Sequence, residues 1–144
     1  MALTASMKTC SENCLVVLVE DDEAIRLVFG ELLRSEGYEV LTFANGREAL
    51  EGLHGTRNPC LILLDWMMPE MNGEQFLRAR TTHETAGKSP VVIVSAVTNW
   101  IQPTPGAEER LPKPVDIDDF LRVVHSHCRH SLSQESAAEP PLAS

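Results

Sequence analysis

Three short apolar runs in this chain each end abruptly in side chains that can take part in chemistry. The runs cover residues 15–19, 61–64 and 91–94, and they end in Glu20-Asp21-Asp22, in Asp65 and in Ser95. Apolar runs of this length, bounded by turn signals, predict buried strands. A fourth strand candidate leads to Lys113. Since open parallel sheets place their sites at the carboxyl ends of the strands, these side chains are expected to meet at one edge, where they suit a hard cation and a phosphoryl group.

Helical patterns separate the expected strands. Between residues 23 and 34 the apolar positions follow helical spacing, and Gly37 is placed to end that helix. We expect Asn45 to cap a second, short helix that ends near residue 53. Two further helices are expected over residues 73–80 and 115–129. The expected strands cover residues 15–19, 38–43, 60–64 and 91–94, with a short fifth strand near 110–111. Alternating strands and helices predict an α/β fold with a parallel sheet covered on both faces.

Length and composition favour one domain. A chain of 144 residues suits one full core, with residues 1–13 as an N-terminal arm, 14–130 as the domain and 131–144 as a disordered tail. The chain lacks an apolar stretch of membrane-spanning length and the apolar core of a signal peptide, so we expect a cytoplasmic protein that does not bind membranes. The net charge of −9 argues against a nucleic-acid partner.

The cysteines and histidines give weaker signals. Cysteine occurs at positions 10, 14, 60 and 128, with no C-x-x-C pair, and we expect reduced thiols. Cys60 opens the apolar run before Asp65 and is expected to pack as a small hydrophobe. The histidine-rich segment 125–130 could bind a metal, but the end of a helix, where histidines complement the dipole, is the favoured interpretation.

Five sequence pieces, in order, resemble the receiver domains of two-component response regulators. They are Val19-Glu20-Asp21-Asp22 with Arg26, Asn45-Gly46 with Glu48-Ala49-Leu50, Leu63-Leu64-Asp65 with Pro69 and Gly73, Ser95-Ala96, and Leu111-Pro112-Lys113-Pro114. The resemblance covers about residues 14–130. It implies a flavodoxin-like, doubly wound sheet of five parallel strands in the order 2-1-3-4-5.

The resemblance also implies a phosphoryl acceptor and a metal. Asp65 would accept a phosphoryl group from a histidine kinase or a histidine phosphotransfer protein. Glu20 and Asp21 would be the acidic pair that, with Asp65 and the backbone carbonyl of Met67, holds Mg²⁺. The chemistry agrees, since Mg²⁺ binds through one or two carboxylates and phosphate oxygens, and a carboxylate can act as a nucleophile.

Two further residues would act on the phosphoryl oxygens. The resemblance implies that Ser95 is the switch hydroxyl, that Lys113 pairs with the phosphoryl group, and that the Lys113-Pro114 bond is cis. Taken singly, Asp65 could be a turn former, Ser95 a cap and Lys113 a surface charge. Their common position at strand ends favours the functional interpretation.

The sequence departs from the family between Ser95 and Lys113. This span is short by about one helical turn and contains Pro103 and Pro105, so we expect the fourth helix to be short or absent, and residues 97–110 to be the most mobile part of the domain. Arg110 stands where the family usually has an aromatic residue that relays the movement of the switch hydroxyl. Trp100 could anchor a partner or cover the sheet edge.

We expect a phosphorelay response regulator rather than a conventional enzyme. No output domain follows residue 129, so it would signal through protein contacts, and it would assist its own Mg²⁺-dependent phosphorylation. The alternative is a pseudo-receiver, a binding module whose output does not need phosphorylation. A haloacid dehalogenase phosphatase would need a second Asp where Met67 stands, and a flavodoxin-like carrier would need a phosphate loop where Glu20-Asp21-Asp22 stands.

Overall fold

The sheet follows the predicted order. The computed structural model describes residues 14–56, 58–68, 71–96 and 106–137. The strands are β1 (Leu15–Val19), β2 (Glu39–Phe43), β3 (Leu61–Asp65), β4 (Val91–Ser95) and β5 (Glu109–Pro112). All neighbouring pairs are parallel, and the order is β2-β1-β3-β4-β5. The predicted flavodoxin-like α/β fold is therefore confirmed.

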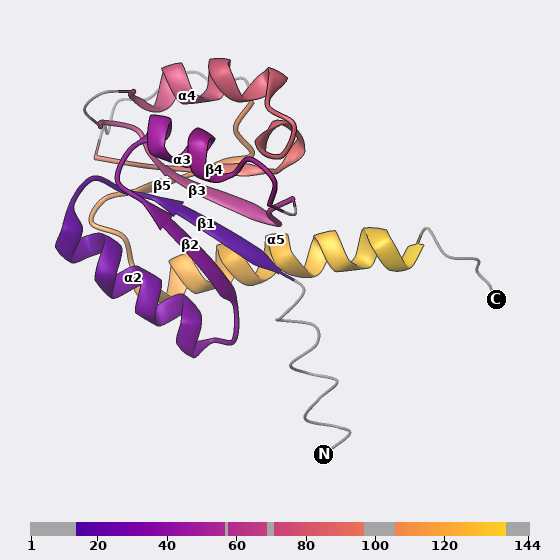
Figure 1. The fold of residues 1–144 in the computed structure, drawn as a ribbon. Helices are drawn as coiled ribbons and strands as arrows, with labels where there is room; N and C mark the ends of the chain where they lie inside the picture. The colour runs from indigo at the N-terminus through magenta and orange to yellow at the C-terminus, as the bar shows by residue number, and fades with distance from the viewer. Residues whose placement is uncertain (1–13, 57, 69–70, 97–105, 138–144) are drawn as a thin grey trace.

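Helices cover both faces of the sheet. They are α2 (Glu23–Ser35), α3 (Gly46–Gly52), α4 (Gly73–Ala79) and α5 (Ile117–Ala137), with two 3₁₀ turns at Arg80–Thr82 and Ala86–Lys88. Helices α2 and α5 lie on one face of the sheet and α3 and α4 on the other (Figure 1). The first crossover leads away from β3, so the order of the strands reverses between β1 and β3, where open sheets of this class form their sites.

Local sequence signals set the helix ends. Asp22, Asn45 and Asn72 each cap a helix by accepting a hydrogen bond from a backbone N–H three residues later, so the predicted Asn45 cap is confirmed. Gly37 has a φ of 97°, a left-handed conformation that favours glycine, and it follows α2 as expected.

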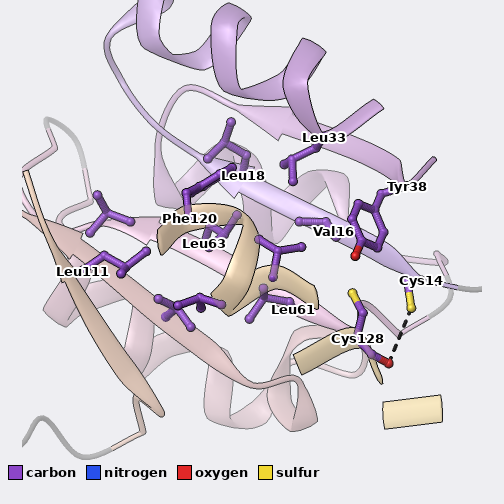
Figure 2. Packing of buried hydrophobic residues seen from close by; sticks show 14 residues of the cluster. Cys14, Val16, Leu18, Leu33, Tyr38, Leu61, Leu63, Leu111, Phe120 and Cys128 are labelled. Atoms are coloured by element: carbon purple, nitrogen blue, oxygen red, sulfur yellow. Dashed lines mark hydrogen bonds between the residues drawn. The ribbon is translucent and has the colours of Figure 1, made fainter. Parts of the chain in front are cut away.

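Two apolar layers hold the sheet. The first packs one face of the strands against α2 and α5 and includes Leu18, Leu33, Leu63 and Phe120 (Figure 2). The second packs the other face against α3 and α4 around Phe76. Strands β1, β3 and β4 are buried along their whole length, which accounts for their continuous apolar runs.

Helix α5 is longer than expected. It runs to Ala137, whereas the sequence predicted an end near residue 129 and disorder from 131. Extending an existing helix adds one hydrogen bond per residue without a new nucleation step, and neither Gly nor Pro interrupts residues 131–137. The helix therefore crosses the expected start of the tail, and the division into arm, domain and tail stays a prediction.

The expected fourth-helix region falls largely outside the described part of the chain. Residues 97–105, with Val97, Trp100, Pro103 and Pro105, lie outside it. The described residues 106–108 form a turn into β5, and Gly106 has a φ of 91°.

Candidate functional site

The parallel sheet brings the predicted site residues to one edge. Asp65 and Ser95 are the last residues of β3 and β4, Glu20 directly follows β1, and Lys113 directly follows β5. Backbone hydrogen bonds fix this edge: the Lys113 N–H donates to the Ser95 carbonyl at 2.9 Å, and the Trp66 N–H donates to the Val94 carbonyl at 3.1 Å.

Three carboxylates form the centre of the cluster. Carboxylate oxygens of Glu20, Asp21 and Asp65 all lie within 4.8 Å of one another. Glu20 and Asp65 are buried and Asp21 is exposed, so the group opens to solvent on one side. Lys113 completes it, with Nζ at 3.2 Å from Glu20 Oε1 and at 3.4 Å from Asp65 Oδ1.

Burial and the neighbouring charges both shift the pKa values at the site. Burial, hydrogen bonding to Asp21 and the charge of Glu20 raise the pKa of Asp65 to about 7, against the lowering effect of Lys113. For Lys113, burial opposes the charged form, but the carboxylates of Asp65 and Glu20 outweigh it and raise its pKa. The ammonium of Lys113 thus does not offset the combined effect of burial and the neighbouring acids on Asp65.

Backbone and guanidinium contacts hold the acidic group in place. Arg26 donates from Nη1 to the Glu20 carbonyl at 2.7 Å, and the Asp22 N–H donates to Glu20 Oε2 at 3.1 Å. The Met67 N–H donates to Asp65 Oδ1 at 3.3 Å. These contacts therefore help to orient the acidic group, in addition to the contacts among its own side chains.

The loop after β3 closes tightly under the site. The Gly73 N–H donates to the Trp66 carbonyl at 2.9 Å. A Cβ at Gly73 would lie 2.3 Å from Trp66 Cε3, so a side chain at this position would displace the indole next to Asp65. Close approach, rather than an unusual φ, requires the glycine here.

Comparison with known proteins identifies the family of this chain. The family model for the response regulator receiver domain matches residues 16–125. The chain belongs to the response regulator receiver domain family. The two-component response regulator ORR3 of Oryza sativa subsp. indica is 37% identical over 126 residues, which are 82% of this chain and 94% of that protein.

Two further relatives show how receiver domains are used elsewhere. The receiver domain of a sensor histidine kinase from Pseudomonas aeruginosa PAO1, solved with a magnesium ion coordinated in its active site cleft, is 26% identical with a TM-score of 0.70, covering 80% of this chain and 97% of that one. The DNA-binding transcriptional regulator NtrC of Klebsiella pneumoniae is 33% identical over 88% of this chain, but only 27% of NtrC is covered.

The donor set of this receiver domain fits a magnesium ion. Three carboxylates with oxygens within 4.8 Å of one another are the hard ligands that Mg²⁺ prefers. The Met67 side chain is 65% exposed at the mouth of the group, and the role of its carbonyl stays a prediction.

The structure also describes the Lys113-Pro114 bond and the positions of Arg110 and Ser95. The Lys113-Pro114 bond is cis, as expected. Arg110 lies exposed on β5, and Ser95 is buried at the end of β4. No helix among the described residues is both long enough and apolar enough to cross a membrane.

The sequence did not indicate one group of residues that could hold a metal ion. Cys14, Cys60 and Cys128 meet in the structure with their sulfur atoms within 4.8 Å of one another. Their wide separation along the chain gives no spacing signal, so only the tertiary structure reveals the group.

Proposed function

We propose that Asp65 accepts a phosphoryl group from a histidine kinase or a histidine phosphotransfer protein. The observation that carries this proposal is that the acidic pair Glu20 and Asp21 and the ammonium of Lys113 all lie close to the buried carboxylate of Asp65. Family membership supports it, because receiver domains take part in two-component signalling.

The transfer divides the chemistry among the site residues. Asp65 forms the new O–P bond as its carboxylate attacks, and the N–P bond of the donor histidine breaks. Lys113 offsets charge on the transferring oxygens from its position 3.4 Å from Asp65. Glu20, Asp21, Asp65 and the Met67 carbonyl would hold Mg²⁺, which when bound supplies the positive charge that the acidic group lacks.

Ser95 is proposed to report the phosphoryl group to the rest of the domain. It ends β4 next to Asp65 at the end of β3, and β3 and β4 are paired along this edge. Its hydroxyl can donate to a phosphoryl oxygen. We propose that the output is protein contact with a separate partner in the cytoplasm, with neither nucleic acid nor membrane involved.

One observation favours the pseudo-receiver alternative. Arg110 lies exposed on β5, at the position where the family usually has an aromatic that follows the switch hydroxyl. Output that does not need phosphorylation would tolerate this change. The complete acidic group at the strand ends opposes it.

Binding of beryllofluoride, which mimics a phosphoryl group, tests the proposal. We expect the wild-type chain to bind it only with Mg²⁺ present, and Asp65→Ala and Asp21→Ala to lose binding. Asp22→Asn is the matched control, since it removes a neighbouring charge but keeps the cap on α2. Isothermal titration and the fluorescence of Trp66 can follow binding.

The two functional hypotheses separate in the same experiments. Binding by the wild type, together with modification of Asp65 by acetyl phosphate seen by mass spectrometry, would support the phosphoacceptor role. A folded wild-type chain that neither binds beryllofluoride nor reacts with acetyl phosphate would be a pseudo-receiver. Tight binding by Asp65→Ala would contradict the site assignment.

A further inference from the structure

Three thiols converge at the edge of the sheet opposite the acidic group. Cys14 directly precedes β1, Cys60 directly precedes β3, and Cys128 lies in α5. Their sulfur atoms lie within 4.8 Å of one another, and all three residues are thiols. Figure 2 shows Cys14 and Cys128 side by side at the end of the core, where Cys14 Sγ donates to the Cys128 carbonyl at 3.7 Å.

The surroundings of this group are apolar. Cys14 is 1% exposed and Cys128 3% exposed, and both belong to the core layer that includes Leu61 and Tyr38. Cys60 is partly exposed and packs against the same layer, so it gives the group one side open to solvent. A buried cysteine often packs as a small hydrophobe, but three that meet from separate elements also form a set of soft ligands.

We propose that Cys14, Cys60 and Cys128 bind one soft ion in three-coordinate geometry, and that its chemical class is trivalent arsenic or a like metalloid. Among the residues that the structure describes, no histidine, carboxylate or further cysteine joins the group. A structural zinc ion almost always takes four ligands, so the three donors found among the described residues favour an ion that is satisfied with three.

Charge in an apolar core also favours a trivalent ion. Three thiolates neutralise a +3 centre completely, whereas they leave a buried net negative charge around divalent zinc and a larger one around monovalent copper. An uncompensated charge in such surroundings is costly. The neutral complex can therefore stay buried against Leu61 and Tyr38.

The binding step balances without any change in oxidation state. Arsenous acid, As(OH)₃, loses its three As–O bonds and forms three As–S bonds. The three thiol protons leave with the three hydroxides as water. Arsenous acid brings hydroxides that take up these protons, whereas simple cations would have to expel them to solvent.

The bound ion would fasten α5 to the two central strands without touching the acidic group. Cys14 and Glu20 lie at opposite ends of β1, as Cys60 and Asp65 do on β3. Six residues of extended chain separate the two groups by roughly 20 Å. The proposed ion site and the proposed phosphorylation site can therefore be tested separately, and failure of one would not affect the other.

Arsenite titration of the full, reduced chain tests the proposal, with native mass spectrometry for stoichiometry and ultrafiltration for affinity. We expect one arsenic per chain, with a mass gain of one arsenic atom less three hydrogens. The melting temperature should rise by roughly 5–10 °C at about a hundredfold excess of free ion over the dissociation constant. Cys60→Ala and Cys128→Ala should each weaken binding by about a hundredfold or more.

Cys10→Ala provides the matched control, since it removes the fourth cysteine of the sequence and keeps the three thiols that meet in the structure. Cys10→Ala should bind as the wild type does. Circular dichroism and urea midpoints verify that each variant is folded, and Cys60→Ala, at the partly exposed position, is the mildest change. Retained affinity in Cys60→Ala, or lost affinity in Cys10→Ala, would overturn the three-thiol assignment. Parallel titrations with Cu(I) and Zn(II) should show weaker binding, and tighter binding of either ion would overturn the choice of a trivalent ion.

Discussion

The surroundings of Asp65 disfavour the charged form of its carboxylate. It is buried at the end of β3, and burial, Asp21 and Glu20 together raise its pKa to about 7. In the absence of Mg²⁺ the folded chain therefore keeps a proton there that the unfolded chain would release near pH 4. The site is strained when ionised, and a cation relieves this strain.

This shift predicts a pH-dependent stability in the presence of a chelator. Because the folded pKa of Asp65 is raised, its contribution to the free energy of unfolding is full below about pH 4 and is lost as the pH rises through about 7. Asp65→Asn should lack this part of the slope. Urea unfolding of both chains between pH 4 and 8 measures the difference, and excess Mg²⁺ should flatten it in the wild type. Identical slopes in the two chains would contradict the raised pKa.

We expect Met67 to affect a later step, the hydrolytic loss of the phosphoryl group from Asp65. Its side chain is 65% exposed beside Asp65, and Val97, which lies outside the described residues, stands two positions after Ser95. Neither side chain can orient a water for hydrolysis of the acyl phosphate, so we expect a long-lived phosphoryl group. Met67→Asn combined with Val97→Glu should speed dephosphorylation at least about tenfold, or about 1.4 kcal/mol of barrier. Decay of radiolabel from Asp65 measures it, and an unchanged rate would refute this reasoning.

At the scale of elements, one buried arginine joins the segments around β4 and β5. Arg80 follows α4 and donates from Nη1 to the carbonyls of Ala86 and Ser89, at 2.8 and 2.7 Å, and from Nη2 to the Gly106 carbonyl at 3.0 Å. A single side chain thus satisfies backbone acceptors before β4 and before β5. The turn that leads into β5 depends on it.

Replacing this arginine should destabilise the fold. Arg80→Met keeps much of the volume but leaves buried carbonyls without donors, and we expect a loss of about 2–4 kcal/mol in the free energy of unfolding. Arg78→Met is the matched control, because Arg78 is exposed and its ion pair among the described residues is with exposed Glu74 at 3.1 Å, so its loss should be below about 0.5 kcal/mol. Urea midpoints measure both, and similar losses in the two variants would contradict the role of Arg80.

At the scale of the whole molecule, stability should rise toward the middle of the sheet. Strands β1, β3 and β4 are buried throughout and have a partner strand on both sides, while β2 and β5 are edge strands with partly exposed residues. Amide exchange should be slowest in the three central strands, because their amides open only with global unfolding. Exchange mass spectrometry tests this, and protection in β5 equal to that in β3 would disprove it.

Features that depend on neighbouring residues could be predicted from the amino-acid sequence alone. Continuous apolar runs predicted the buried strands, because a strand covered on both faces has no solvent side to mark with polar residues. The Asn45 cap and the stop at Gly37 follow from short-range hydrogen bonding and backbone geometry. The meeting of Asp65 and Ser95 at one edge of the sheet could also be predicted, because the carboxyl ends of parallel strands lie together.

Contacts between residues that are distant in the sequence depend on how the elements pack. The contact of Lys113 with Glu20, the three backbone carbonyls around Arg80 and the meeting of Cys14, Cys60 and Cys128 all join segments that no local pattern links. Helix α5 ends at Ala137 and not at the expected residue 129, because a helix nucleated by packing on the sheet extends at little cost. Local chemistry therefore decided most elements and their caps, and packing of the elements in three dimensions decided the extent of α5 and the partners of the charged and sulfur-containing side chains.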